Sequence, residues 1–125
     1  MNNRNSQAAV ATSLVMSQNA ANTAAATSGW VDVRQYEGDL LFVQKVGALT
    51  GSIAGAIQDA TDNSGTGAAA MTPNEGAFTS VSSANSTQKR TIDAKSTRGF
   101  VRYVGTITTG PAQVDVTMLS VPKNP

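Results

Sequence analysis

Five basic side chains lie within fourteen positions of the second half of the chain, with Asp93 as the one acid among them: Lys89, Arg90, Lys95, Arg98 and Arg102. Basic clusters can bind phosphate groups. Lys89 and Arg90 are adjacent, however, and adjacent strand residues point to opposite faces of a sheet, so the cluster is not expected to form one patch. Three interpretations stay open, in this order: a solvated or protein-facing surface, a contact with a carboxylate of another chain, and nucleic acid.

A second group of polar residues, Asp59, Asp62 and Asn63, precedes a glycine-rich segment. Its oxygen atoms suggest calcium, but a helical calcium loop that started at Asp59 would need Gly at its sixth position and Glu at its twelfth. Those positions hold Ser64 and Ala70. A turn closed by hydrogen bonds to the aspartate side chains explains the same residues. We therefore expect no metal site and no cofactor.

The composition disfavours catalysis and nucleic-acid binding. The chain has no histidine and no cysteine, and its net charge is +1. Histidine is the usual general base near neutral pH, and motifs for a serine nucleophile or a phosphate-binding loop are missing. Nucleic-acid binders usually carry a strong basic excess. We expect a protein that is not an enzyme and has no nucleic-acid partner.

The elements that position these residues form one domain, because 125 residues leave little room for a second core. No apolar run reaches the roughly 18 residues that span a bilayer, and no continuous apolar segment resembles a signal peptide. We expect no membrane partner and synthesis in the host cytoplasm. Composition changes near Gly29, which predicts an N-terminal arm over 1–29 and a β-sandwich domain over 30–125.

The arm carries a thin apolar stripe. Val10 and Leu14 are four residues apart, which would place them on one side of a helix over 7–21, and Met16 ends the run that begins at Leu14. Such a stripe is too narrow to fold alone. The arm is extended or partly helical, and either disordered in isolation or docked on a partner through Val10, Leu14 and Met16.

Short runs of β-favouring residues follow, separated by turn residues. Strands are predicted at 31–34, 40–46, 53–58, 78–81, 88–94, 100–108 and 113–121, with a surface loop over 59–77. The 40–46 run is largely continuous and apolar, as in a strand buried on both faces or a central strand with one face in the core and one against a neighbour. Ala54 and Ala56 leave one face of the next strand without bulk, so another chain can approach it closely.

The last two strands are expected to pair as an antiparallel hairpin through the turn at Gly110 and Pro111. In the last strand, Val114, Val116 and Met118 alternate with polar residues, as in a half-buried strand. Together these patterns predict an all-β fold, an antiparallel β-sandwich of jelly-roll-like type with an extended N-terminal arm.

Charge is divided unevenly between the two halves of the body. Residues 31–75 hold six acids and two bases (−4), and residues 76–125 hold six bases and two acids (+4). Cross-strand pairs within one subunit would neutralise this difference. The alternative is a head-to-tail contact between subunits in a ring. Trp30, at the junction of arm and body, either caps the core or anchors in a neighbour's pocket.

The body resembles small capsid cement or decoration proteins of tailed bacteriophages. The resemblance covers about residues 30–121 and rests on the order of residues 30–41, 44–47, 50–53 and 58–60, and on the arginine-bearing and aromatic segment 98–108. These motifs are structural, not catalytic. The first 29 residues carry none of them.

The resemblance implies a virion protein on the outer capsid surface that cements adjacent subunits of the major capsid protein and self-associates, commonly as a homotrimer. The residues expected to form the partner interface are Val10, Leu14, Met16, Trp30, Arg90, Arg98 and Arg102. A carbohydrate-binding or adhesive module of a phage tail or fibre is the alternative, and it would need exposed aromatic rings along a groove.

Overall fold

The computed structural model describes residues 10–15, 25–109 and 111–123. Regular structure in these ranges consists of nine strands and a single 3₁₀ turn. They are β1 (Val10–Val15), β2 (Ala25–Thr27), β3 (Val31–Asp32), β4 (Tyr36–Leu49), β5 (Ser52–Ala60), β6 (Ala69–Met71), β7 (Ser86–Asp93), η1 (Ala94–Ser96), β8 (Phe100–Thr108) and β9 (Ala112–Pro122). Within the described ranges, then, no helix is long enough to cross a bilayer.

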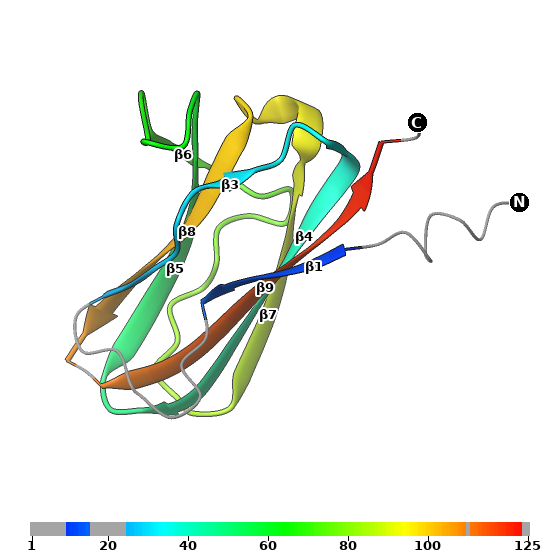
Figure 1. The fold of residues 1–125 in the computed structure, drawn as a ribbon. Helices are drawn as coiled ribbons and strands as arrows, with labels where there is room; N and C mark the ends of the chain where they lie inside the picture. The colour runs from blue at the N-terminus through cyan, green and yellow to red at the C-terminus, as the bar shows by residue number, and fades with distance from the viewer. Residues whose placement is uncertain (1–9, 16–24, 110, 124–125) are drawn as a thin grey trace, which may run out of the picture.

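The strands form two antiparallel sheets that pack face to face (Figure 1). The first, called sheet A, has the order β1-β9-β4-β7, and the second, called sheet B, has the order β2-β8-β5-β6, with β3 also pairing with β8. Most connections cross from one sheet to the other, as in a double-sheet jelly roll. The predicted fold class, an all-β antiparallel sandwich, is confirmed.

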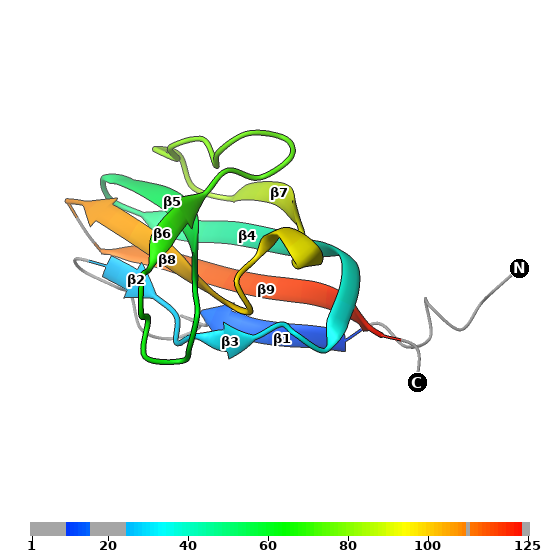
Figure 2. The ribbon, with the colours of Figure 1, turned by 90° about the horizontal axis from the view of Figure 1, so that it is seen from above.

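The predicted hairpin of the last two strands is wrong. β8 pairs with β5 in sheet B, and β9 pairs with β4 in sheet A, so the turn at Pro111 links the two sheets. Figure 2 shows β9 between β1 and β4, its neighbours in sheet A. A turn sequence shows where the chain reverses but does not determine which sheet receives the next strand.

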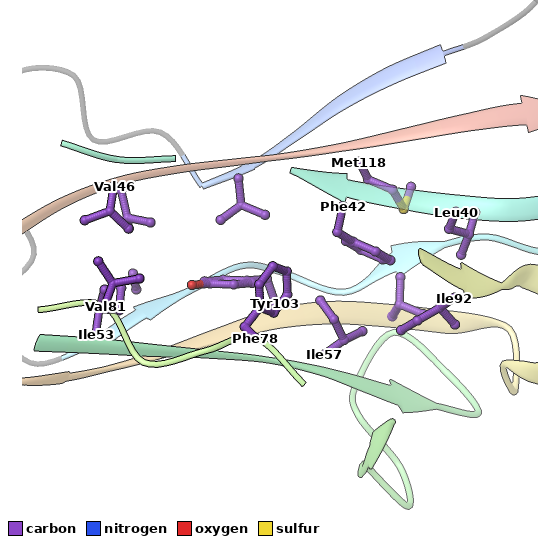
Figure 3. Close-up of a cluster of buried hydrophobic side chains, with 14 of the residues drawn as sticks. Leu40, Phe42, Val46, Ile53, Ile57, Phe78, Val81, Ile92, Tyr103 and Met118 are labelled. Atoms are coloured by element: carbon purple, nitrogen blue, oxygen red, sulfur yellow. The ribbon is translucent and has the colours of Figure 1, made fainter. Parts of the chain in front are cut away.

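The core lies between the sheets and follows the alternation of the strands. Val114, Val116 and Met118 are buried, as their spacing predicts. Figure 3 shows Phe42 and Met118 entering from sheet A, opposite Ile53 and Ile57 from sheet B. Burial on this scale supplies the main favourable term in folding.

One polar bond crosses this apolar core. The Tyr103 hydroxyl of β8 donates to Oε1 of Gln44 on β4 at 2.5 Å, and both side chains are fully buried. Burial raises the pKa of the Tyr103 hydroxyl well above its ordinary range. Gly55 makes room for the pair, because a Cβ there would lie 2.2 Å from Gln44 Oε1 and 2.7 Å from the Tyr103 hydroxyl oxygen. The two sheets are thus held in register at one defined point.

The segment between β5 and β7 differs from its prediction in two places. The expected surface loop over 59–77 contains β6, which pairs with β5. The expected strand over 78–81 is irregular except for one bridge between Val81 and Ile53. Phe78 and Val81 are nevertheless buried, and they close one open side of the sandwich (Figure 3). Apolar residues here fill a gap between sheets without forming a ladder.

The described parts of the expected N-terminal arm are extended. β1 adds an edge strand to sheet A beside β9, and β2 adds one to sheet B beside β8. The helical alternative is therefore wrong over Val10–Val15. Pairing with β9 provides the partner that a thin apolar stripe lacks by itself.

The apolar run over 40–46 belongs to a central strand, since β4 lies between β9 and β7. Leu40 and Phe42 point into the core and are fully buried. Leu41 and Val43 point outward and are half-buried. β4 is therefore a central strand that is not buried on both faces, and the contact of its outer face with a neighbour stays a prediction.

Candidate interaction surface

The outer face of sheet B is covered by small uncharged side chains. Ala54 and Ala56 of β5 are exposed there, as their sequence pattern predicts. Their cross-strand neighbours on β8 are Thr106 and Val104, and Thr27 of β2 extends the row. We call these five residues the small-residue face. A surface without long side chains loses little rotamer entropy when another protein covers it.

A tryptophan lies next to this face. The Arg102 guanidinium is stacked over the Trp30 ring, 4.6 Å from its centroid. Arg102 also donates from Nε to Gln58 Oε1 at 2.9 Å. On another side Gly65 approaches the ring so closely that a Cβ there would lie 2.9 Å from Trp30 Nε1. Trp30 is half-buried and firmly held, so it neither caps the core between the sheets nor swings freely in solvent.

The same arrangement is repeated one row further along β8. The Arg34 guanidinium lies 5.0 Å from the centroid of the Phe100 ring. It also forms an ion pair with Asp32 at 2.8 Å, in which the two side chains are 67% and 38% exposed. Sequence reasoning did not find this pair, although the spacing Asp32-x-Arg34 places both residues on one side of a strand.

The end of sheet B is fastened by Asp59 and Arg98. The Asp59 carboxylate accepts hydrogen bonds from the Arg98 backbone N–H, Nε and Nη2 at 2.9–3.2 Å. Nη2 also donates to the backbone oxygens of Asp59 and Gly67. The Asp59 side chain is only 8% exposed, and the bonds from the Arg98 side chain hold the pKa of its carboxyl below the ordinary value. Asp59 is thus the carboxylate partner of Arg98 within the same chain.

The aspartates of the sequence that suggested calcium, Asp59 and Asp62, accept hydrogen bonds from groups of the same chain. Asp62 accepts from the backbone N–H groups of Ser64 and Thr66 and from the Thr66 hydroxyl. The predicted turn closed by an aspartate side chain is therefore confirmed. The Thr66 hydroxyl in particular holds the pKa of the Asp62 carboxyl below its ordinary value. Among the residues that the structure describes, no three His, Cys, Asp or Glu side chains gather into a possible metal site.

Lys89 and Arg90 point to opposite faces of sheet A, as predicted. Lys89 is exposed. The Arg90 guanidinium lies 5.4 Å from the centroid of the Phe78 ring, and its Nε donates to the backbone oxygen of Gly76. Arg90 therefore fastens the segment that closes the open side of the sandwich. The basic cluster does not form one patch.

The structure gathers only part of the predicted interface. Trp30, Arg102 and Arg98 lie around the 61–68 loop, whereas Arg90 is on β7. Val10 is 36% exposed on β1, and Leu14 packs against the core from the same strand. Met16 lies outside the described residues. Whether these residues contact a partner stays a prediction.

The uneven charge of the two halves is neutralised in part within the chain. Asp59 belongs to the acidic half and Arg98 to the basic half, and they form an ion pair. Lys45 and Asp115 are also direct neighbours across β4 and β9. The expected neutralisation inside one subunit is thus found at Asp59 and Arg98, although Arg98 lies just before β8 and is not a cross-strand neighbour of Asp59. It does not account for every charge on sheet A.

An open cavity of about 690 Å³ lies at the end of the sandwich, near η1. Its lining carries both charge signs, with Glu37, Asp39 and Asp93 beside Lys95 and Lys123.

Comparison with known proteins supports the fold alone. No family model and no curated protein matches the chain. The crystal structure of the SPBc2 prophage-derived protein YomS is similar with a TM-score of 0.55 at 15% identity, covering 90% of this chain and 94% of that one. A family 11 carbohydrate-binding module from Clostridium thermocellum gives a TM-score of 0.38 at 10% identity, covering 91% of this chain and 84% of the module. The K1 cleaved adhesin domain of Lys-gingipain from Porphyromonas gingivalis W83 gives 0.40 at 11%, covering 94% and 75%. The last two values are too low to support an argument.

Proposed function

We propose that the chain is a structural virion protein without catalytic activity. It would bind the outer surface of an assembled phage capsid and cement adjacent subunits of the major capsid protein. The observation that carries this proposal is the small-residue face with the Trp30–Arg102 stack beside it. The resemblance of residues 30–121 to capsid cement proteins gives the kind of partner.

The composition of this surface suits a protein–protein contact. The centres of such interfaces are depleted in charge and enriched in aromatic residues and arginine. Ala54, Ala56 and Thr106 are uncharged, and the one large ring beside them is Trp30. Tryptophan and arginine are also the residues that most often carry binding energy. Because Arg102 already holds the ring in place, little side-chain entropy is lost on binding.

The fold similarity is compatible with the proposal. YomS is a prophage-derived protein, and it shares the sandwich over almost the whole length of both chains. Double-sheet jelly rolls also occur in viral capsid and lectin domains. A shared fold does not determine function, so the choice between a capsid cement protein and a carbohydrate-binding module depends on the residues at the surface.

The carbohydrate-binding alternative needs aromatic faces that are open to a sugar ring. Here the Trp30 ring lies under Arg102, and the Phe100 ring lies under Arg34. Stacked guanidinium groups occupy the positions that a sugar would take. This arrangement favours the protein partner.

The proposed mechanism is mass action. A protein that binds only the assembled lattice stabilises it by an amount that rises with the logarithm of its free concentration divided by its Kd. Self-association, which the resemblance implies to be trimeric, adds avidity because several copies engage neighbouring sites together.

The test uses capsids of the virus or prophage whose genome encodes the chain. Particles assembled without the chain are mixed with it, sedimented, and then challenged by heat. We expect the chain to pellet with the particles and to raise the temperature at which they release DNA. Trp30→Ala and Ala56→Glu should reduce co-sedimentation at least about tenfold, the effect of losing a binding hot spot.

Lys89→Glu, on the outer face of the other sheet, is the control and should leave capsid binding unchanged. Binding to purified tails or to cell-surface glycans, with none to capsids, would contradict the proposal and favour the adhesive module.

A further inference from the structure

The outer face of sheet A, opposite the small-residue face, has an apolar centre. Leu41 and Val43 of β4 are half-buried there. Leu41 lies directly opposite Leu119 of β9, and Leu119 lies opposite Ala11 of β1. The described strands belong to two sheets, and none of them forms a third layer over these residues. We call the outward residues of sheet A the A face.

Charges of opposite sign flank this centre along β4. Glu37 and Asp39 are exposed at one end, and Lys45 is exposed at the other. On β7 the order is the same, with Asp93 near the acidic end and Lys89 near the basic end. The outward side chains of β4 therefore run from acid through apolar to base, and on β7 Thr91 separates Asp93 from Lys89.

The acidic end contains an unfavourable pair. Asp39 and Asp93 are directly opposite each other across β4 and β7. Like charges at such positions destabilise a sheet unless a cation lies nearby. Neither aspartate forms an ion pair with a described basic residue. A cation supplied from outside the chain would relieve this repulsion.

A second copy of the chain carries that cation at the right place. We relate the two copies by a two-fold axis that lies in the plane of contact and runs across the strands at Phe42. This rotation reverses the strand direction, so that Asp39 of one copy lies over Lys45 of the other and Leu41 lies over Val43. Two-fold contacts of this kind use the same patch on both subunits.

We propose that the A face binds a second copy of this chain in a two-fold, face-to-face dimer. Sheets in such contacts pack about 10 Å apart with their strands within about 30° of each other. Asp115 lies opposite Lys45 and offsets one of the two positive charges of the basic end, so Lys45, Lys89 and Asp115 together leave that end net positive. Four bases line the cavity beyond the strand ends: Arg34, Lys95, Arg98 and Lys123. Arg34 and Arg98 are paired with Asp32 and Asp59, so Lys95 and Lys123 reduce the net charge of the acidic end without reversing its sign.

The size of the A face indicates how tight the dimer is. Four strands about 4.8 Å apart, over six or seven residues of about 3.3 Å each, cover roughly 400 Å² per copy. The total of about 800 Å² lies below the roughly 1,200 Å² at which standard specific interfaces begin, so the dimer is a weak one, and we expect a Kd between about 10 μM and 1 mM that increases with salt. A two-fold contact gives a dimer and not the trimer that the family resemblance implies.

Analytical ultracentrifugation of the chain from about 10 μM to 1 mM tests this inference. We expect a monomer–dimer equilibrium at low salt. Asp39→Lys and Lys45→Glu should each weaken it at least about tenfold, since each puts like charges face to face. The double variant Asp39→Lys/Lys45→Glu exchanges the two signs and should return to within about threefold of the unmodified chain.

Ala54→Asp places a new acid on the other sheet and serves as the matched control, with no effect on the equilibrium. Thermal unfolding of each variant verifies that it is folded. A chain that stays monomeric throughout, forms trimers, or dimerises equally well with either single reversal would overturn the proposal. Trp30→Ala and Ala56→Glu lie on the sheet B side, so a loss of capsid binding in these two variants is independent of the dimer.

Discussion

The two outer faces of the sandwich differ in how their charged side chains are paired within the chain. On the sheet B side, each arginine is held by a group of its own chain: Arg34 by Asp32 and Phe100, Arg98 by Asp59, and Arg102 by Trp30 and Gln58. On the A face the bases are lysines, and strand register brings Asp39 against Asp93. Both ion pairs found among the described residues use arginine.

The difference follows from the chemistry of the two cations. Arginine has a planar group that stacks on rings and binds carboxylates through two bonds, whereas lysine is a compact, strongly hydrated point charge. In the proposed function, the arginines on the sheet B side hold the docking surface in place. In the proposed dimer, the lysines on sheet A supply the charge that orients the second copy.

The largest effect is expected from removing the internal partner of Asp59. Arg98→Met leaves a carboxylate that is 8% exposed without its cation, which should lower the Tm by roughly 10 °C. Arg34→Met breaks an exposed pair and should change the Tm by no more than about 2 °C. Differential scanning calorimetry at neutral pH measures both. Equal shifts would show that sheet B is not fastened at Asp59.

A smaller decrease in Tm is expected from a substitution on the inner face of β5, and almost none from one on its outer face. Gly55→Ala directs a methyl group into the Tyr103–Gln44 bond and should lower the Tm by about 6 °C. Ala56→Ser, one residue further on, points outward and should leave the Tm within about 2 °C. If Gly55→Ala were as stable as the unmodified chain, the inter-sheet bond would not be set by the space at Gly55.

The smallest expected effect is the loss of stability at low pH. Hydrogen bonds lower the pKa values of Asp59 and Glu75 in the folded chain from ordinary values of 3.8 and 4.5. A lowered pKa stabilises the fold above the ordinary value, and this stabilisation is lost as pH falls through the folded pKa. Urea unfolding between pH 7 and about pH 2 should therefore show decreasing midpoints below about pH 4. The decrease should be shallower in Arg98→Met, and an identical slope would contradict the role of that pair.

Much of the fold could be predicted from the sequence. Alternation in β9 indicated which residues enter the core, and turn residues delimited most strands. The small side chains of Ala54 and Ala56 indicated an approachable face before its position was known. Local spacing encodes these features, because a strand has a period of two residues.

The remainder depends on contacts between distant parts of the chain. Neither the assignment of β8 and β9 to different sheets nor the pairing of Asp59 with Arg98, 39 residues away, leaves a local signal. Phe78 and Val81 have strand-like residue types but fill the side of the core. Leu41 and Val43 point outward, and their apolar side chains alone do not show this. An apolar run in a sequence does not distinguish residues of the core from apolar residues on an outer face.

An image of the decorated particle tests the central claim most directly. Cryo-electron microscopy of capsids incubated with the chain should show the sandwich seated with Trp30, Ala56 and Thr106 against the shell, over a junction between major capsid subunits. Density that places any other surface of the sandwich against the shell, or a shell without added density, would contradict the account.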